Sequence, residues 1–138
     1  MALKLFHTGL SSLGILFWGN LLTVAARWQG VTRTVRFIKK IASWLPLYAG
    51  DLDQYSIRID KLRENLPFLF FAHRQGCLIR GLLLLFFGKR RKLNVQLHFG
   101  SKIVDQRFDT HCWISLDGKV RFEVDEVVRQ YTPLIEYM

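Results

Sequence analysis

The order of its predicted elements indicates that this chain folds as an α+β domain, with helices first and a small antiparallel sheet last. Apolar residues recur at helical spacing in the earlier part of the chain. Beyond residue 92, apolar and polar residues alternate on the way to the hairpin signal Asp117-Gly118. The chain has 138 residues, of which 50% are hydrophobic and 22% are charged, as expected for a folded protein. We expect a helical region over 1–66 and a core over 67–138, packed together as one compact domain.

The uncharged stretch 5–26 leaves three interpretations open. Its length suits a membrane span, which needs about 20 apolar residues. The small residues at its end also resemble the cleavage site of a secretory signal. Small and polar side chains gather on one helical face, however, and larger apolar side chains on another: Leu13, Phe17 and Leu21. That pattern favours a helix packed on the domain or lying at a membrane interface.

Three further helices are predicted before the sheet. Apolar residues at helical spacing indicate a helix over 31–45, and a second over 56–66 that Pro67 ends. The third covers 76–88, because an unbroken apolar run bounded by glycines is typical of a buried helix. We expect Gly88 to form its carboxy-terminal cap.

The strands follow from alternation and turn signals. Residues 93–99 alternate strictly between apolar and polar, as a half-buried strand should. Strands over 109–115 and 119–124 flank the Asp117-Gly118 turn. A last short helix or strand is expected over 127–135, interrupted by Pro133.

The chain is strongly basic, and the excess of positive charge is uneven. Its net charge is +9, with five basic residues and no acid over 27–40 and four consecutive basic residues over 89–92. Such runs can form a solvated surface or meet nucleic acid, an anionic membrane or an acidic peptide. Nucleic acid is the least favoured partner, because the basic runs lack interleaved aromatic residues and a helix-turn-helix pattern.

Cys77 and His111 are the candidate nucleophile and base of a thiol hydrolase. Cys77 lies at the start of the helix over 76–88, where the unpaired backbone N–H groups favour the thiolate. His111 follows on a later strand, and an imidazole beside the thiol can take its proton. The two residues need only meet in space, so their separation in sequence is no objection.

The hairpin predicts which carboxylate orients the imidazole. A three-residue loop, 116–118, places Glu123 directly across from His111, with the two Cβ atoms about 5 Å apart. A two-residue Asp-Gly turn would instead place Val124 there and turn Glu123 away. We therefore predict Glu123 as the third member, with Asp125 as the alternative.

No disulfide and no metal site are expected. Adjacent side chains on a strand point to opposite faces, so Cys112 should face away if His111 faces Cys77. The spacing of the four histidines does not suggest metal ligation. We expect His98 to face solvent, and Trp113 either to shield the imidazole or to belong to the core.

Two motifs together resemble the lasso-peptide leader peptidases, small bacterial proteins of the transglutaminase-like, papain-type cysteine peptidase fold. Their Cys-Leu-x-Arg helix is matched by CLIR at 77–80. Their His-x-Trp strand leading to Asp-Gly is matched by HCWISLDG at 111–118, and Glu123 stands twelve positions beyond His111, where the family has its acid. Gly100 also fits, and the resemblance covers about 66–135.

The chain departs from that pattern at four positions. Gly81 replaces the usual serine, Cys112 replaces an alanine, and Ser115 replaces a common glutamate. The expected acid is Glu123 rather than aspartate, and a glutamate side chain is still long enough to reach an imidazole.

The resemblance implies a cysteine protease that removes the leader from a ribosomally made lasso-peptide precursor, without a cofactor. It also implies a small winged-helix leader-recognition protein as a partner, with a lasso cyclase and an ABC exporter encoded nearby. Such an enzyme would act in the cytoplasm, free or membrane-associated through the first helix. The alternatives are a thioester-forming acyltransferase of transglutaminase-like type and a non-catalytic basic scaffold at a membrane.

Overall fold

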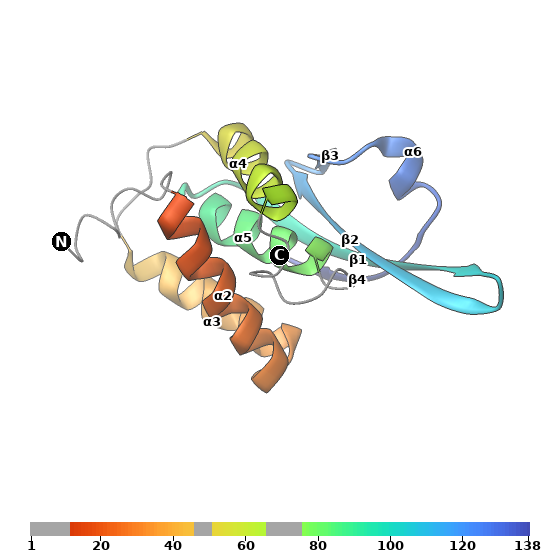
Figure 1. The fold of residues 1–138 in the computed structure, drawn as a ribbon, viewed down its shortest axis with the longest axis horizontal. Coiled ribbons are helices and arrows are strands. Elements are labelled where there is room, and N and C mark those ends of the chain that lie inside the picture. Colours follow the sequence, from red (N-terminus) through yellow and green to blue (C-terminus); the bar gives the residue numbers. More distant parts are fainter. Residues whose placement is uncertain (1–11, 46–50, 66–75) are drawn as a thin grey trace.

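A computed structural model describes residues 12–45, 51–65 and 76–138. It has the predicted α+β class (Figure 1). Its helices are α2 (Ser12–Gln29), α3 (Val31–Trp44), α4 (Leu52–Asn65), α5 (Gly76–Arg90) and α6 (Asp125–Val128). Its strands are β1 (Val95–Val104), β2 (Arg107–Leu116), β3 (Lys119–Arg121) and β4 (Thr132–Tyr137). Pro67, His73 and the first part of the stretch 5–26 lie outside the described residues.

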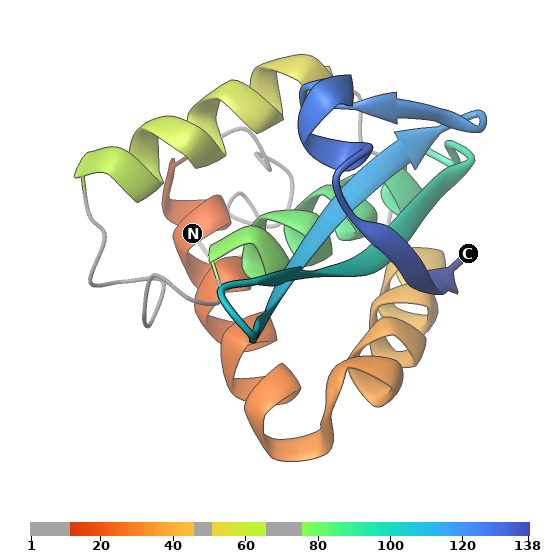
Figure 2. The same cartoon turned by 90° about the vertical axis from the view of Figure 1, so that its right-hand side faces the viewer.

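Helix α5 is the centre of the molecule. One face of the antiparallel sheet, whose strand order is β3-β2-β1-β4, packs against α5, as do α2, α3 and α4 (Figures 1 and 2). A run of six side chains from Leu82 to Phe87 is fully buried. Because α5 is enclosed by other elements, nearly all of its circumference is apolar.

The prediction that Gly88 caps α5 is wrong, because the helix continues to Arg90. Gly88 is buried, and a Cβ atom there would lie 2.5 Å from Val95 Cγ2, so this glycine lets β1 approach the helix. The cap falls instead at Lys92, which has φ 57°, and the Leu93 N–H donates to the Gly88 carbonyl at 3.0 Å. These are the features of a Schellman ending.

Helix α4 begins four residues earlier than predicted. The Asp51 carboxylate accepts a hydrogen bond from the Asp53 N–H at 3.1 Å, as an N-cap residue does. Asp51 therefore starts α4.

Strands β1 and β2 form a longer hairpin than predicted, and its far end projects from the body of the molecule (Figure 1). Its turn consists of Asp105 and Gln106, both with positive φ angles (48° and 63°). This conformation is uncommon for residues other than glycine, and no glycine marks the turn in the sequence.

The three-residue loop predicted between β2 and β3 is wrong. Leu116 pairs with Lys119 and Ser115 with Val120, so the turn has two residues, Asp117 and Gly118, at φ 52° and 78°. Positive φ at both central residues is the geometry that matches the twist of flanking strands. Strand β3 is short and pairs only with the last part of β2.

The last predicted segment contains both a helix and a strand. Helix α6 is a single turn, and β4 pairs antiparallel with β1 at an edge of the sheet, with a register shift beside Gly100. Pro133 lies within β4, which is tolerated because an edge strand leaves one side without a partner.

Candidate active site

Cys77 is the second residue of α5 and opens onto a cavity of about 360 Å³. His111 from β2 and Glu123, which follows β3, line the same cavity. The structure therefore brings together the three residues chosen from the sequence. Asp125 begins α6 and is exposed, so the geometry favours Glu123 over that alternative.

The surroundings of Cys77 favour its thiolate. The pKa of Cys77 is lowered to about 4, first of all by a hydrogen bond from the Cys112 side chain. Contact with the His111 side chain and a hydrogen bond with the Cys112 backbone contribute to the same lowering, whereas burial opposes it. A thiolate at neutral pH is the form that attacks a carbonyl carbon.

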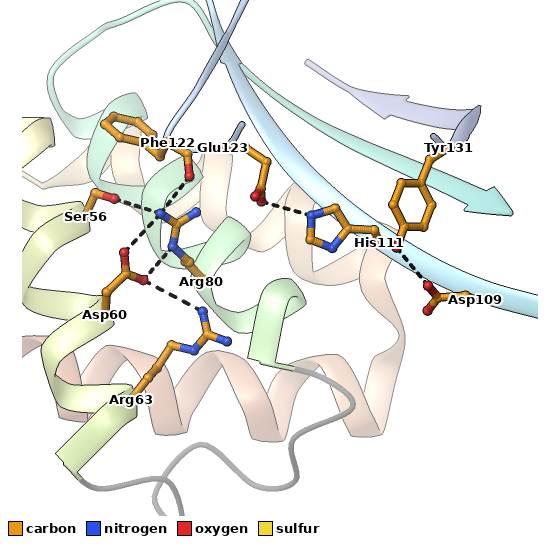
Figure 3. A network of polar contacts seen from close by, with 9 residues as sticks. All are labelled: Ser56, Asp60, Arg63, Arg80, Asp109, His111, Phe122, Glu123 and Tyr131. Carbon is orange, nitrogen blue, oxygen red and sulfur yellow. Dashed lines mark hydrogen bonds and ion pairs between the residues drawn. The ribbon is translucent and has the colours of Figure 1, made fainter. Parts of the chain in front are cut away.

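The imidazole of His111 is held between Cys77 and Glu123. Its Nε2 lies 2.9 Å from Glu123 Oε2, which leaves Nδ1 to exchange a proton with the thiol (Figure 3). Interaction with Cys77 raises the pKa of His111 above its ordinary value, and the Glu123 carboxylate adds to this against the effect of burial. A raised imidazole pKa beside a lowered thiol pKa favours the thiolate–imidazolium pair.

Glu123 reaches His111 by a different route from the one predicted. In the observed register, an unbroken β3 would turn Glu123 away from His111. The strand ends at Arg121, however, and Phe122 adopts φ 62°. This left-handed residue redirects the chain, so that the Glu123 carboxylate meets the ring.

Arg80 holds that redirected segment in place. Its guanidinium donates 2.9 Å to the Phe122 carbonyl and 3.0 Å to Ser56 Oγ, and it pairs with Asp60 through two contacts of 2.8 and 3.2 Å (Figure 3). Arg63 lies 3.8 Å from the same carboxylate. Arg80 is three residues beyond Cys77 on α5. The same helix therefore carries the thiol and the guanidinium that binds the Phe122 carbonyl, next to Glu123. The CLIR motif included Arg80, but the sequence did not reveal this role.

Aromatic rings enclose the other sides of His111. Trp113 is buried, and its ring lies 6.3 Å from that of His111, at 25° between the planes. Tyr131 lies 5.2 Å away and donates a 2.8 Å hydrogen bond to Asp109. Gly100 allows this packing, because a Cβ atom there would come within 2.9 Å of both Trp113 and Tyr131. Trp113 thus acts as both shield and core.

The expectation that Cys112 points away from Cys77 is wrong. Cys112 does face α5, since its sulfur would lie 3.9 Å from a Cβ atom at Gly81, one helical turn beyond Cys77. Strand β3 pairs with β2 only over residues 114–116, so β2 is an open edge at Cys112. Cys77 lies at this edge, where the side chains of both His111 and Cys112 reach it. Both thiols are free. The interaction with Cys77, together with burial, raises the pKa of Cys112 well above its usual range.

The prediction that His98 faces solvent is also wrong. Its ring is part-buried and stacks on Trp113, with centroids 5.7 Å apart, and Nε2 lies 2.7 Å from Ser115 Oγ. Burial lowers the pKa of His98. Across the described ranges, no group of three or more His, Cys, Asp or Glu side chains has an arrangement that could hold a metal ion.

Comparison with known proteins assigns the family. The model of the transglutaminase-like superfamily matches residues 57–136. The chain belongs to this superfamily. The matched segment contains Cys77, His111 and Glu123, and it begins within α4, after α2 and α3. Neither the curated proteins nor the solved structures gave a match.

Proposed function

We propose that this member of the transglutaminase-like superfamily is a cysteine peptidase that removes the leader from a lasso-peptide precursor. The contact of 2.9 Å between Glu123 and His111, on an imidazole that also interacts with Cys77, supports thiol-based catalysis. The CLIR and HCWISLDG motifs, which resemble those of the leader peptidases, support the choice of substrate.

In the proposed reaction, the Cys77 thiolate attacks the carbonyl carbon of the last leader residue. The His111 imidazolium then gives its proton to the departing amine, and the leader remains bound to Cys77 as a thioester. Water, deprotonated by the now neutral imidazole, hydrolyses this thioester and regenerates the thiol. Glu123 keeps the ring oriented and stabilises its positive charge, so Glu123 is assigned as the acid of the triad.

The proposed partners follow from the same resemblance. They are the precursor peptide, a small winged-helix protein that binds the leader, and a cyclase that uses the amine released by cleavage. An ABC exporter would act on the finished peptide. The reaction would take place in the cytoplasm.

The decisive experiment incubates the protein with a precursor and the leader-binding partner, and follows cleavage by mass spectrometry. Wild type should release a leader with a free carboxylate. Cys77→Ala and His111→Ala should not, although both should give the circular dichroism spectrum of the folded wild type. Normal processing by Cys77→Ala would contradict the proposal. A new amide in place of the free carboxylate would identify an acyltransferase instead.

Thiol labelling tests the remaining alternative, a scaffold without catalysis. At neutral pH, Cys77 should be alkylated much faster than Cys112, and His111→Ala should remove most of that difference. Equal and slow labelling of the two cysteines in the wild type would favour the scaffold.

A further inference from the structure

Helix α2 is apolar on both of its faces, although only one face is buried. Ile15, Trp18 and Leu22 pack into the core, together with small residues on the same side. The opposite face exposes four large apolar side chains at positions i, i+4, i+7 and i+11, which we call the α2 stripe: Phe17, Leu21, Val24 and Trp28. A helix that is apolar all round normally has both faces covered.

The exposure of the stripe is substantial. Trp28 is 88% exposed and Phe17 is 54% exposed. Single apolar residues on a surface are common, but an ordered row along one helix marks an interaction surface. Within the described residues, no helix combines the length and the hydropathy that crossing a membrane requires. The exposed row itself is what indicates a surface for binding.

The charged side chains of α2 and α3 are all positive. The first fifty residues contain no Asp or Glu. Helix α3 packs beside α2 and exposes a cluster of basic residues, which we call the α3 basic arc: Arg33, Arg36, Lys39 and Lys40. Packed helices lie about 8–10 Å apart, within roughly one Debye length at physiological salt. These charges thus act on whatever the α2 stripe contacts.

Trp44 adds a second exposed indole at the end of α3. It is 74% exposed, and the ammonium group of Lys40 lies 5.1 Å from its ring centre. Tryptophan next to basic side chains is typical of helices at the boundary between lipid headgroups and acyl chains.

We propose that the hairpin of α2 and α3 docks on an anionic lipid bilayer, with the α2 stripe inserted at the interface and the α3 basic arc contacting the headgroups. Apolar burial and attraction to anionic lipid each supply only part of the binding, so both are needed for stable attachment. Acidic protein surfaces offer the same charge but not the acyl layer that four large apolar side chains require.

The test is co-sedimentation of the full chain with lipid vesicles, without any peptide substrate, so it is independent of peptidase activity. The protein should bind vesicles of phosphatidylcholine with phosphatidylglycerol and should bind pure phosphatidylcholine much more weakly. Serine at all four stripe positions should reduce binding more than tenfold. Each of Arg33→Gln, Arg36→Gln and Lys40→Gln should reduce it about fivefold.

The matched control replaces an exposed apolar pair near the tip of the β1–β2 hairpin, far from α2 in sequence. Ile103→Ser with Phe108→Ser removes side chains of similar exposure and should leave vesicle binding unchanged. Lipids brominated on their acyl chains should quench the fluorescence of wild type more strongly than that of Trp28→Phe. This second measurement holds even if the fourfold serine variant fails to fold.

Three results would overturn the proposal. The first is equal vesicle binding by wild type and a folded stripe variant. The second is a failure of wild type to bind any vesicle while it self-associates through the stripe. In that case a second copy of the chain, and not lipid, would bury the α2 stripe. The third is equal binding to neutral and anionic vesicles, which would remove the role of the basic arc.

Discussion

The candidate active site and the outer face of α2 depart from the usual arrangement of side chains in opposite ways. Around Cys77, polar and titratable side chains are partly buried and interact with one another. Along the α2 stripe, large apolar side chains are exposed to water. The first arrangement is complete within the chain, whereas the second is completed only by another surface. A protein keeps such departures where they serve a function.

The two tryptophans of α2 give the largest contrast. Trp18 is 5% exposed and packs against Phe86 with ring centres 4.4 Å apart, so Trp18→Ala should lower the free energy of unfolding by about 3–5 kcal/mol. Trp28→Ala, on the exposed face of the same helix, should change it by less than about 0.5 kcal/mol. Urea titration measures both, and equal losses would mean that the stripe is already buried in the free protein.

Within the active site, the comparison is between two nearby carboxylates. Glu123→Ala should reduce kcat/KM about a hundredfold, because the imidazole loses the group that orients it. Asp125→Ala should have little effect on cleavage, since that side chain is exposed at the start of α6. The reverse ranking would make Asp125 the acid. Vesicle binding should be the same in both variants.

The dependence on pH should separate the two regions. Cys77 has a lowered pKa of about 4 and His111 a raised one, so the thiolate–imidazolium pair exists from about pH 4 to beyond the ordinary histidine value of 6.5. Below this window kcat/KM should fall about tenfold per unit as the thiolate is protonated, and above it as the imidazolium loses its proton. Vesicle binding involves neither Cys77 nor His111 and should not follow this profile. An activity profile with no acid limb near pH 4 would contradict the assignment.

The smallest effect is expected at Cys112. Its thiol provides the strongest stabilisation of the Cys77 thiolate, so Cys112→Ala should raise the pKa of Cys77 by about one unit or more. Cys112→Ser keeps a hydrogen-bond donor and should shift the pKa less. The rate of alkylation of Cys77 as a function of pH reports both values. Identical profiles for alanine and serine would show that the donor is unimportant.

The chemistry of the site could be predicted from residue types, but its geometry could not. Cys77 and His111 follow from what a thiolate and an imidazole do, and alternation identified the strands that carry them. Glu123 was chosen through a register that the structure does not have. The decisive feature is the left-handed backbone of Phe122. Arg80, 42 residues earlier in the sequence, stabilises it through a hydrogen bond, and the residues around Phe122 do not indicate this conformation.

Other differences also depend on contacts between distant segments. Gly88 looks like a cap until the approach of Val95 is known, and the Asp105-Gln106 turn lacks the glycine that usually marks such a conformation. The side chains of His111 and Cys112 point to opposite faces of β2, as expected. The sequence does not show, however, that β3 ends at Arg121, before it could pair with Cys112. The sequence shows that α2 is apolar, but only the packing shows that the face with Phe17 and Leu21 remains uncovered.

Cys77 and Arg80 lie on the same turn of α5, and Arg80 donates a hydrogen bond to the carbonyl of Phe122, the residue before Glu123. The positions of the nucleophile and the acid therefore both depend on α5. A small shift of α5 would carry both of them together, whereas His111 would stay with the sheet. The spacing between the Cys77 sulfur and the His111 imidazole is therefore set by how α5 packs on β2.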